Sequence, residues 1–228
     1  MRDRPYATID AILLDLDGTL VDSARDLQEA LNRLLAEEGL RSLSLPEVQG
    51  MIGDGVRKLV ERALAATGGD PARADAVLPR YLALYERAAS RHTEVYPGVL
   101  DTLRVLRGEG LRLAVVTNKP EAATWIVLKA LGLDAVLDAV VGGDTLPQRK
   151  PDPAPLHEAL RRLGVGPDRA VMVGDNHHDV NAARAAGVRA VIVGYGYAHG
   201  TPGSFGADRL IDAFPDLLAA LRALDRGA

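Results

Sequence analysis

Residues 9–19 read Ile-Asp-Ala-Ile-Leu-Leu-Asp-Leu-Asp-Gly-Thr. The apolar run at the start of this stretch is typical of a strand that is buried on both faces. Asp15 and Asp17 alternate with Leu16, so in an extended chain both carboxylates leave on the same side. Gly18 then allows the backbone to turn sharply. Two carboxylates this close repel each other without a cation, so the pair predicts a site for a hard metal ion such as Mg²⁺, with a solvated turn as the alternative.

Four more apolar runs follow along the chain, and they alternate with segments of helical spacing. The predicted strands are Ile9–Leu16, Leu113–Thr117, Ala139–Gly142, Ala170–Gly174 and Val188–Val193. The predicted helices are Pro120–Leu131, Pro153–Leu163, Asp179–Ala186 and Pro215–Leu224. This alternation predicts an α/β fold, a Rossmann-like parallel sheet with helices on both faces. Ligands of such sheets bind beyond the carboxyl ends of the strands, so the polar residues that follow the strands form the candidate site.

One segment, residues 22–91, breaks the alternation because it shows helical spacing and no strand pattern. A turn sequence at 68–71, Gly-Gly-Asp-Pro, separates two of its helices. We therefore predict a small helical domain, 22–91, inserted after the first strand. Residues 1–21 and 92–228 would form the α/β core, and Tyr-Pro-Gly at 96–98 would mark the return to it.

Polar side chains also follow three other predicted strands. Thr117 and Asn118 offer hydroxyl and amide donors where a helix begins, which suits phosphate oxygens. Lys150 can offset the negative charge of an acid and of a bound phosphoryl group. Asp175 would complete a carboxylate set for Mg²⁺, and Asp179 could orient a metal-bound water or hold Lys150. Each feature alone also has an ordinary explanation, as a helix N-terminus, a surface lysine or a helix cap.

In their order along the chain, these motifs resemble the four-motif signature of the haloacid dehalogenase-like hydrolase superfamily. The motifs are Asp15-x-Asp17-Gly18-Thr19, Thr117-Asn118, Lys150-Pro151 and Gly174-Asp175-x-x-x-Asp179. The likeness covers essentially the whole chain, including a helical cap inserted after the first motif. The chain is similar above all to the bacterial phosphoglycolate phosphatases, through stretches such as Ile52-Gly-Asp-Gly55 and Val116-Thr-Asn-Lys-Pro120. Asn176 departs from the serine that is common in the family.

The resemblance implies a role for each motif residue. Asp15 would attack phosphorus and form an aspartyl-phosphate, while Asp17 would protonate the leaving alkoxide and then activate water. Mg²⁺ would be held by Asp15, by the backbone carbonyl of Asp17 and by Asp175. Thr117 and Lys150 would hold the phosphoryl oxygens as charge spreads in the transition state.

Four further residues are assigned to substrate binding. Gly18 and Asn118 belong to the phosphate-binding motifs. In the helical segment, Gly53 begins a Gly-Asp-Gly loop whose backbone N–H groups could face the site. Arg57, one turn into the next helix, could meet a substrate carboxylate such as that of 2-phosphoglycolate. The alternative is that these glycines form a tight turn and that Arg57 is solvated.

The acid at Asp17 favours a phosphatase over a dehalogenase, because a halide leaves without a proton whereas an alkoxide needs one. The best prediction is hydrolysis of 2-phosphoglycolate to glycolate and phosphate. A phosphatase or phosphomutase for another small ester, such as a sugar phosphate or pyrophosphate, stays open because it needs the same two acids. The alternative from another class is a non-catalytic phosphate-binding module, which would tolerate loss of the motif residues.

The composition of the 228 residues, 47% hydrophobic and 25% charged, is that of a globular protein. The absence of cysteine excludes disulfides and thiolate chemistry and fits a reducing cytoplasm. A net charge of −4 without a basic cluster argues against nucleic acid as a partner. No apolar run approaches the roughly 20 residues of a membrane helix, and the N-terminus does not read as a signal peptide. We predict a cytoplasmic monomer or homodimer that acts on a small phosphorylated metabolite.

Overall fold

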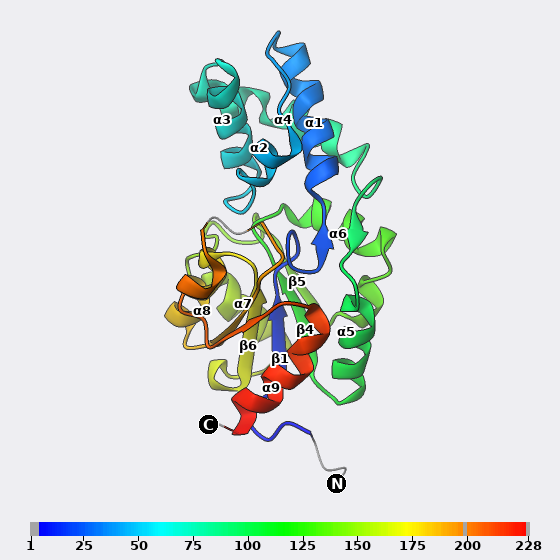
Figure 1. The fold of residues 1–228 in the computed structure, drawn as a ribbon, viewed down its shortest axis with the longest axis vertical. Coiled ribbons are helices and arrows are strands. Elements are labelled where there is room, and N and C mark those ends of the chain that lie inside the picture. The colour runs from blue at the N-terminus through cyan, green and yellow to red at the C-terminus, as the bar shows by residue number, and fades with distance from the viewer. Residues whose placement is uncertain (1–4, 198–199, 227–228) are drawn as a thin grey trace.

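A computed structural model describes residues 5–197 and 200–226 and shows a sheet-containing part with a helical part stacked above it (Figure 1). The sheet has six strands in the order β5-β4-β1-β6-β7-β8. The strands are β1 (Ala11–Leu14), β4 (Arg112–Val116), β5 (Ala139–Val141), β6 (Ala170–Gly174), β7 (Arg189–Val193) and β8 (Arg209–Ile211). Every pairing in this sheet is parallel, so the carboxyl ends of all its strands lie at one edge. In Figure 1 this edge faces the helical part.

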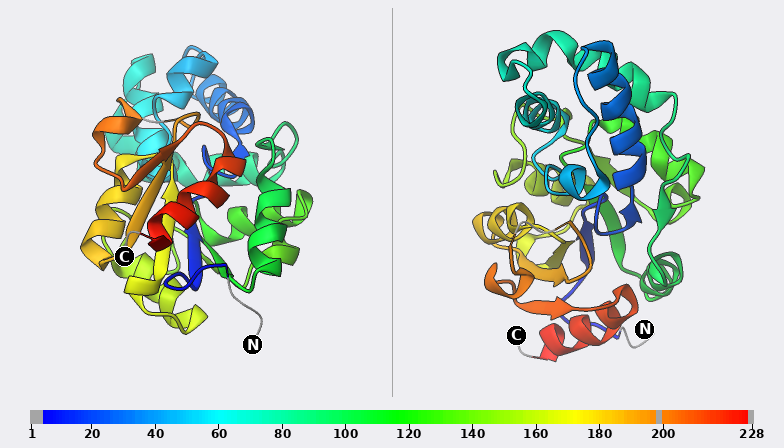
Figure 2. Two further views of the ribbon diagram at one scale, coloured as in Figure 1. Left: turned by 60° about the horizontal axis from the view of Figure 1, so that its bottom comes forward. Right: turned by 45° about the horizontal axis from the view of Figure 1, so that its top comes forward.

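Helices cover both faces of the sheet, as Figure 2 shows. The helices of the core are α5 (Val99–Gly108), α6 (Glu121–Ala130), α7 (Ala154–Leu163), α8 (His177–Ala186) and α9 (Leu217–Arg226). Alternate residues of β1 point to opposite faces. Ile12 and Leu14 pack in a cluster with α5, α6 and α9, whereas Ala11 and Leu13 pack with α7 and α8. The predicted parallel sheet with helices on both faces is therefore confirmed.

The prediction missed the edge strand β8. It is three residues long, and Leu210 in its middle is 49% exposed, so it shows no buried apolar run. The strand forms because Val193 of β7 pairs with Ile211, a tertiary contact that local sequence does not reveal. The predicted first strand was also too long, since the ladder of β1 ends at Leu14, one residue before the acidic loop.

The helical part consists of four helices with a hydrophobic cluster of their own. These helices are α1 (Ala24–Glu37), α2 (Leu45–Gln49), α3 (Val56–Thr67) and α4 (Ala74–Glu86). Leu31, Val60 and Tyr81 lie in this cluster and are almost fully buried. A short antiparallel ribbon, β2 (Val21–Asp22) with β3 (Glu94–Val95), joins the helical part to the core.

The remaining elements are single turns of 3₁₀ helix. They are η1 (Pro71–Arg73), η2 (Asp134–Val136), η3 (Pro167–Arg169), η4 (Pro202–Ser204) and η5 (Phe214–Asp216). Across 5–197 and 200–226, none of the helices combines the length and the apolar character that crossing a membrane would take.

Candidate active site

Asp15 and Gly18 begin the site at the end of β1. The N–H of Asp15 donates to the carbonyl of Val173 at 2.9 Å, which holds the start of the acidic loop against β6. Gly18 has a φ of +85°, and a side chain at this position would collide with the carboxylate of Asp175. Glycine is therefore required here because the loop passes directly over another acid of the site.

Lys150 is the central cation of the site. Its Nζ lies 2.9 Å from Asp15 Oδ1 and 2.6 Å from Asp179 Oδ1, and the residue is 5% exposed. Burial alone would lower the pKa of Lys150, but the two carboxylates outweigh it and raise that pKa above its ordinary value. The lysine is thus charged and held between Asp15, in the loop after β1, and Asp179, in α8. The sequence predicted a lysine that offsets the negative charge of an acid at this place.

Three carboxylates gather around this lysine. One oxygen each of Asp15, Asp175 and Asp179 lie within 4.8 Å of one another. Burial raises the pKa of Asp15 to about 6, which Lys150 partly offsets, and burial together with the charges of Asp15 and Asp179 raises the pKa of Asp175. Buried carboxylates that repel one another are the oxygen donors that Mg²⁺ binds, so the residues present fit a magnesium ion.

Asp179 has a second, structural partner at the start of α8. The N-cap of this helix is Asn176, whose N–H donates to Asp179 Oδ2 at 3.0 Å. The sequence had suggested Asp179 itself as a possible N-cap, and that suggestion is wrong by three residues. One carboxylate oxygen therefore completes a capping box while the other binds Lys150, which ties the orientation of the acid to the helix end.

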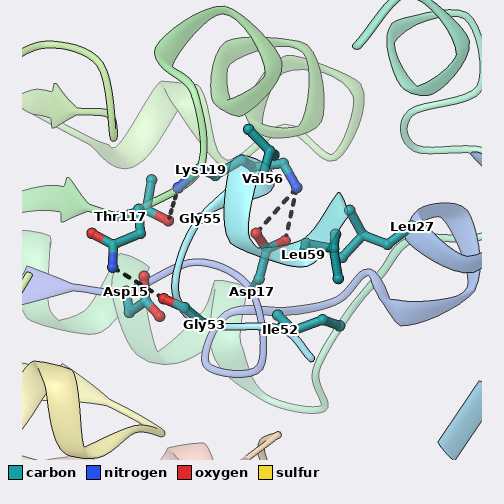
Figure 3. A pocket seen from close by; sticks show the side chains of 11 residues that line it. Asp15, Asp17, Leu27, Ile52, Gly53, Gly55, Val56, Leu59, Thr117 and Lys119 are labelled. Carbon is teal, nitrogen blue, oxygen red and sulfur yellow. Dashed lines mark hydrogen bonds and ion pairs between the residues drawn. The ribbon is translucent and has the colours of Figure 1, made fainter. Parts of the chain in front are cut away.

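Asp17 points to a different set of partners. Its carboxylate oxygens lie 3.0 and 3.1 Å from Nζ of Lys119 (Figure 3). Oδ1 also accepts a hydrogen bond of 2.5 Å from Ser23 Oγ. The side chain of Asp17 is not among the three acids that could share a metal ion, and the expected contact through its backbone carbonyl stays a prediction. Sequence reasoning assigned no role to Lys119 or Ser23, although the quoted Thr-Asn-Lys stretch contains the lysine.

Thr117 and Asn118 follow β4 and line the same cavity. The hydroxyl of Thr117 accepts the N–H of Lys119 at 3.2 Å and keeps its own proton for donation. The side-chain NH₂ of Asn118 donates to the carbonyls of Gly53 and Lys150, both at 3.0 Å. Both amide protons are used, so the assignment of this side chain as a phosphate donor is corrected: it holds two loops in place.

The Gly-Asp-Gly loop at 53–55 lies against the core. Besides the contact of Gly53 with Asn118, Asp54 lies 2.5 Å from His178 Nε2 on α8 and 2.5 Å from Arg62 on α3. The ring of His178 on the core therefore contacts the helical part. The loop is thus a point at which the two parts of the molecule meet.

Arg57 lies outside the site, so its assignment to a substrate carboxylate is not supported. Its guanidinium binds Asp75 and Glu61 at 2.7 to 2.9 Å, and its side chain is 46% exposed. Neighbouring residues of a helix point about 100° apart, and in α3 Val56 faces the cavity. Arg57 is consequently turned toward solvent, which is the alternative that the sequence left open.

The cavity lies between the two parts of the molecule (Figure 3). Its polar lining comes from the core: Asp15, Asp17, Thr117, Asn118 and Lys119. Its remaining lining comes from the helical part: Leu27, Ile52, Gly53, Gly55, Val56 and Leu59. The charged side chains therefore lie on the core side of the cavity, and the side formed by the helical part is apolar.

Tyr197 connects the acidic cluster to the start of the helical part. Its N–H donates to Asp175 Oδ2 at 2.6 Å, and its hydroxyl oxygen accepts the N–H groups of Ser23 and Ala24 at 2.7 and 3.0 Å. The same hydroxyl donates to Asp22 at 2.5 Å.

Residues 12–193 match the family described as haloacid dehalogenase-like hydrolase. The chain belongs to this family. It is 47% identical to the phosphoglycolate phosphatase of Rhodospirillum rubrum, an alignment covering 91% of this chain and 88% of that protein. It is 44% identical to the phosphoglycolate phosphatase of Cereibacter sphaeroides, over 93% of this chain and 99% of the relative. The likeness to bacterial phosphoglycolate phosphatases is therefore confirmed, and the chain is an enzyme of the phosphoric monoester hydrolase class.

Solved structures give the same result for the fold of this hydrolase. A predicted phosphoglycolate phosphatase from Haemophilus somnus superposes with a TM-score of 0.89 at 32% identity and covers 94% of this chain and 98% of its own. CbbY from Rhodobacter sphaeroides, solved in complex with phosphate, superposes with a TM-score of 0.81 at 29% identity, over 93% and 99% of the two chains.

Proposed function

We propose that this hydrolase removes phosphate from a small phosphorylated metabolite, with 2-phosphoglycolate as the best candidate, through an aspartyl-phosphate on Asp15 and with Mg²⁺ as cofactor. The observation that carries the proposal is the position of Lys150 Nζ, 2.9 Å from Asp15 and 2.6 Å from Asp179 beside the third acid, Asp175. A nucleophile, a fixed cation and a cluster of oxygen ligands in one buried site are what phosphoryl transfer requires.

Each residue of the site then has one task. Asp15 attacks phosphorus, and Lys150 and the hydroxyl of Thr117 bind the phosphoryl oxygens. Asp17 protonates the leaving alkoxide and afterwards removes a proton from the water that hydrolyses the aspartyl-phosphate. Gly18 has no side chain and so gives the phosphoryl group access to the backbone of the loop.

Asp15, Asp175 and the backbone carbonyl of Asp17 would hold Mg²⁺, with Asp179 supporting the set through Lys150. When bound, the ion supplies positive charge that neutralises the phosphoryl oxygens and the acids around it. The fit rests on the three carboxylates that converge within 4.8 Å.

We also propose that residues 22–91 act as a cap that closes over the core. The apolar wall formed by Leu27, Ile52, Val56 and Leu59 supports this role, because it would exclude water from the reacting phosphate. The predictions of a monomer or homodimer and of a cytoplasmic location come from the sequence and stay predictions.

The names of the curated relatives support phosphoglycolate as the substrate. A related structure, a mutant of CbbY, was solved in complex with xylulose-(1,5)bisphosphate, at 28% identity and a TM-score of 0.78. Sugar phosphates and bisphosphates therefore belong in any substrate panel beside phosphoglycolate and pyrophosphate.

The test is the release of inorganic phosphate from such a panel, with Mg²⁺ and with excess EDTA. We expect 2-phosphoglycolate to give the highest kcat/KM and EDTA to abolish turnover. Asp15→Asn should lower kcat by roughly 10³-fold or more, because the nucleophile is lost. Asp101→Asn, at an 85% exposed side chain outside the site, is the matched control and should leave kcat unchanged.

Two results would contradict the proposal in different ways. Turnover by Asp15→Asn at the wild-type rate would exclude the aspartyl-phosphate. Isomerisation of a sugar phosphate with little release of phosphate would identify a phosphomutase, because a mutase returns the phosphoryl group to its substrate.

A further inference from the structure

Lys119 is a second buried lysine in the site, and the phosphate chemistry described above does not use it. The residue is 5% exposed and lies where α6 begins, two residues after Thr117. Its Nζ contacts both carboxylate oxygens of Asp17, at 3.0 and 3.1 Å, and both residues line the cavity (Figure 3). Lys150 contacts Asp15, the proposed nucleophile. Lys119 contacts Asp17, the acid proposed to protonate the leaving group.

The surroundings keep Lys119 charged. Its Nζ lies 4.6 Å from the centre of the Tyr85 ring, a favourable position for a cation over an aromatic face. Burial alone would lower the pKa of this ammonium group, but Asp17 and Tyr85 raise it above its ordinary value. The Tyr85 hydroxyl itself is buried and has no hydrogen-bond partner within the described part of the chain. A small anion that reached this corner would meet a buried ammonium group that it shares with the carboxylate of Asp17.

The other cations near the cavity are engaged elsewhere. Arg57 binds Asp75 and Glu61, and Arg62 binds Asp54. Arg149 donates from Nε to the carbonyl of Gly143 at 2.5 Å and is not among the residues that line the cavity. Of the described residues that line the cavity, Lys119 is the basic one, and the wall opposite to it is apolar.

We propose that Lys119 is the residue that selects the substrate, by binding a carboxylate carried on the leaving group of the phosphate ester. This inference rests on the proposed phosphatase function. In 2-phosphoglycolate one CH₂ group separates the carboxylate from the bridging oxygen. When Asp17 lies at that oxygen, the carboxylate therefore comes close to the ammonium group that Asp17 contacts. The substrate class is phosphate monoesters of small 2-hydroxy acids.

The experiment compares pairs of esters that match in size and differ in the carboxylate. The pairs are 2-phosphoglycolate with ethyl phosphate, and 2-phospholactate with isopropyl phosphate. We expect wild-type kcat/KM to favour the carboxylated member of a pair. Lys119→Met, which keeps the length of the side chain, should reduce that preference by about 100-fold, mainly through KM, since loss of one partner of a buried charge pair costs about this much. Ethyl phosphate turnover should fall as well, because Asp17 loses its contact with the ammonium group, but by a smaller factor than turnover of 2-phosphoglycolate.

The matched control is Lys129→Met. Lys129 lies on α6, the helix that follows Lys119, and is also over an aromatic ring, at 5.8 Å from the centre of Trp125, but outside the cavity. Lys129→Met should leave kcat/KM unchanged for both esters of a pair. If Lys119→Met does not fold, Lys119→Gln takes its place, because the shorter amide can still donate to Asp17.

The outcomes separate this proposal from the proposed function. If Lys119→Met lowered kcat/KM equally for both members of a pair, Lys119 would only position Asp17, and its role in substrate selection would be overturned. A wild-type enzyme without preference for the carboxylated esters would overturn it as well, even if phosphatase activity were present. Turnover of 2-phospholactate without turnover of 2-phosphoglycolate would disprove the proposed substrate, and the second pair would then carry the test of Lys119.

Discussion

The two sides of the cavity are built in opposite ways. On the core side, Lys150 lies within 3 Å of Asp15 and Asp179, and these residues lie in segments that follow three different strands of one sheet. On the helical side the wall is apolar, and its polar links to the core include the contacts of Gly53 with Asn118 and of Asp54 with His178. In the proposed mechanism the core would determine the reaction, whereas a small number of contacts would determine how the helical part closes.

The strongest test of this division is Lys150→Met, for which we expect kcat to fall by about 10³-fold. The substitution leaves the charges of Asp15 and Asp179 without their shared cation and removes a donor to the phosphoryl oxygens. Steady-state kinetics on the best substrate measures the effect. Lys58→Met, which removes an exposed lysine paired with Glu61, is the control. A loss in kcat of less than tenfold would show that the core cation is dispensable.

The acidic cluster should also destabilise the metal-free protein at neutral pH. The pKa of Asp15 is about 6 in the folded protein and 3.8 as its ordinary value, so the folded state binds the proton more tightly than the unfolded chain. Ionisation of Asp15 therefore costs stability as pH rises from about 4 to about 6. In EDTA at pH 8, the free energy of unfolding of Asp15→Asn should exceed that of wild type by up to about 3 kcal/mol, which raises its unfolding temperature, with no gain at pH 4.

Thermal unfolding at both pH values, with and without Mg²⁺, measures this effect. Addition of Mg²⁺ at pH 8 should stabilise the wild type more than Asp15→Asn, because the ion relieves the same repulsion. Asp101→Asn serves as the control for the substitution. A wild type that is as stable as Asp15→Asn in EDTA at pH 8 would contradict the expected repulsion.

On the helical side, we expect a smaller effect from His178→Gln. The substitution alters the 2.5 Å contact with Asp54 and weakens closure of the loop, so KM should rise about fivefold while kcat changes less. His157→Gln, at an exposed position of α7, is the matched control. An unchanged KM would remove the Asp54 contact from the closing mechanism.

The smallest effect is expected for Arg57→Ala. The guanidinium pairs with Asp75 and Glu61 on the surface, so KM for 2-phosphoglycolate should stay within about twofold of wild type. A large rise in KM for phosphoglycolate alone would restore Arg57 to the substrate site and would require the helical part to rearrange on binding.

Much of this protein was determined by its sequence alone. The alternation of apolar runs with helical spacing indicated the parallel sheet, because buried parallel strands need continuous apolar residues. The same alternation placed Asp15, Lys150 and Asp175 at strand ends, and parallel strands bring their carboxyl ends to one edge. The core of the site could therefore be predicted without coordinates.

Only the tertiary structure decided the partners of side chains whose neighbours lie far away in the chain. The helical spacing around Arg57 left open whether its side chain lies on the cavity face or on the solvent face of α3. Because Val56 lines the cavity, Arg57 points to solvent. Lys119 looked like an ordinary residue at a helix start, yet it meets Asp17, 102 positions earlier in the chain. A local sequence pattern indicates whether a segment forms a helix or a strand, but the partner of a charged side chain depends on which distant elements pack beside it.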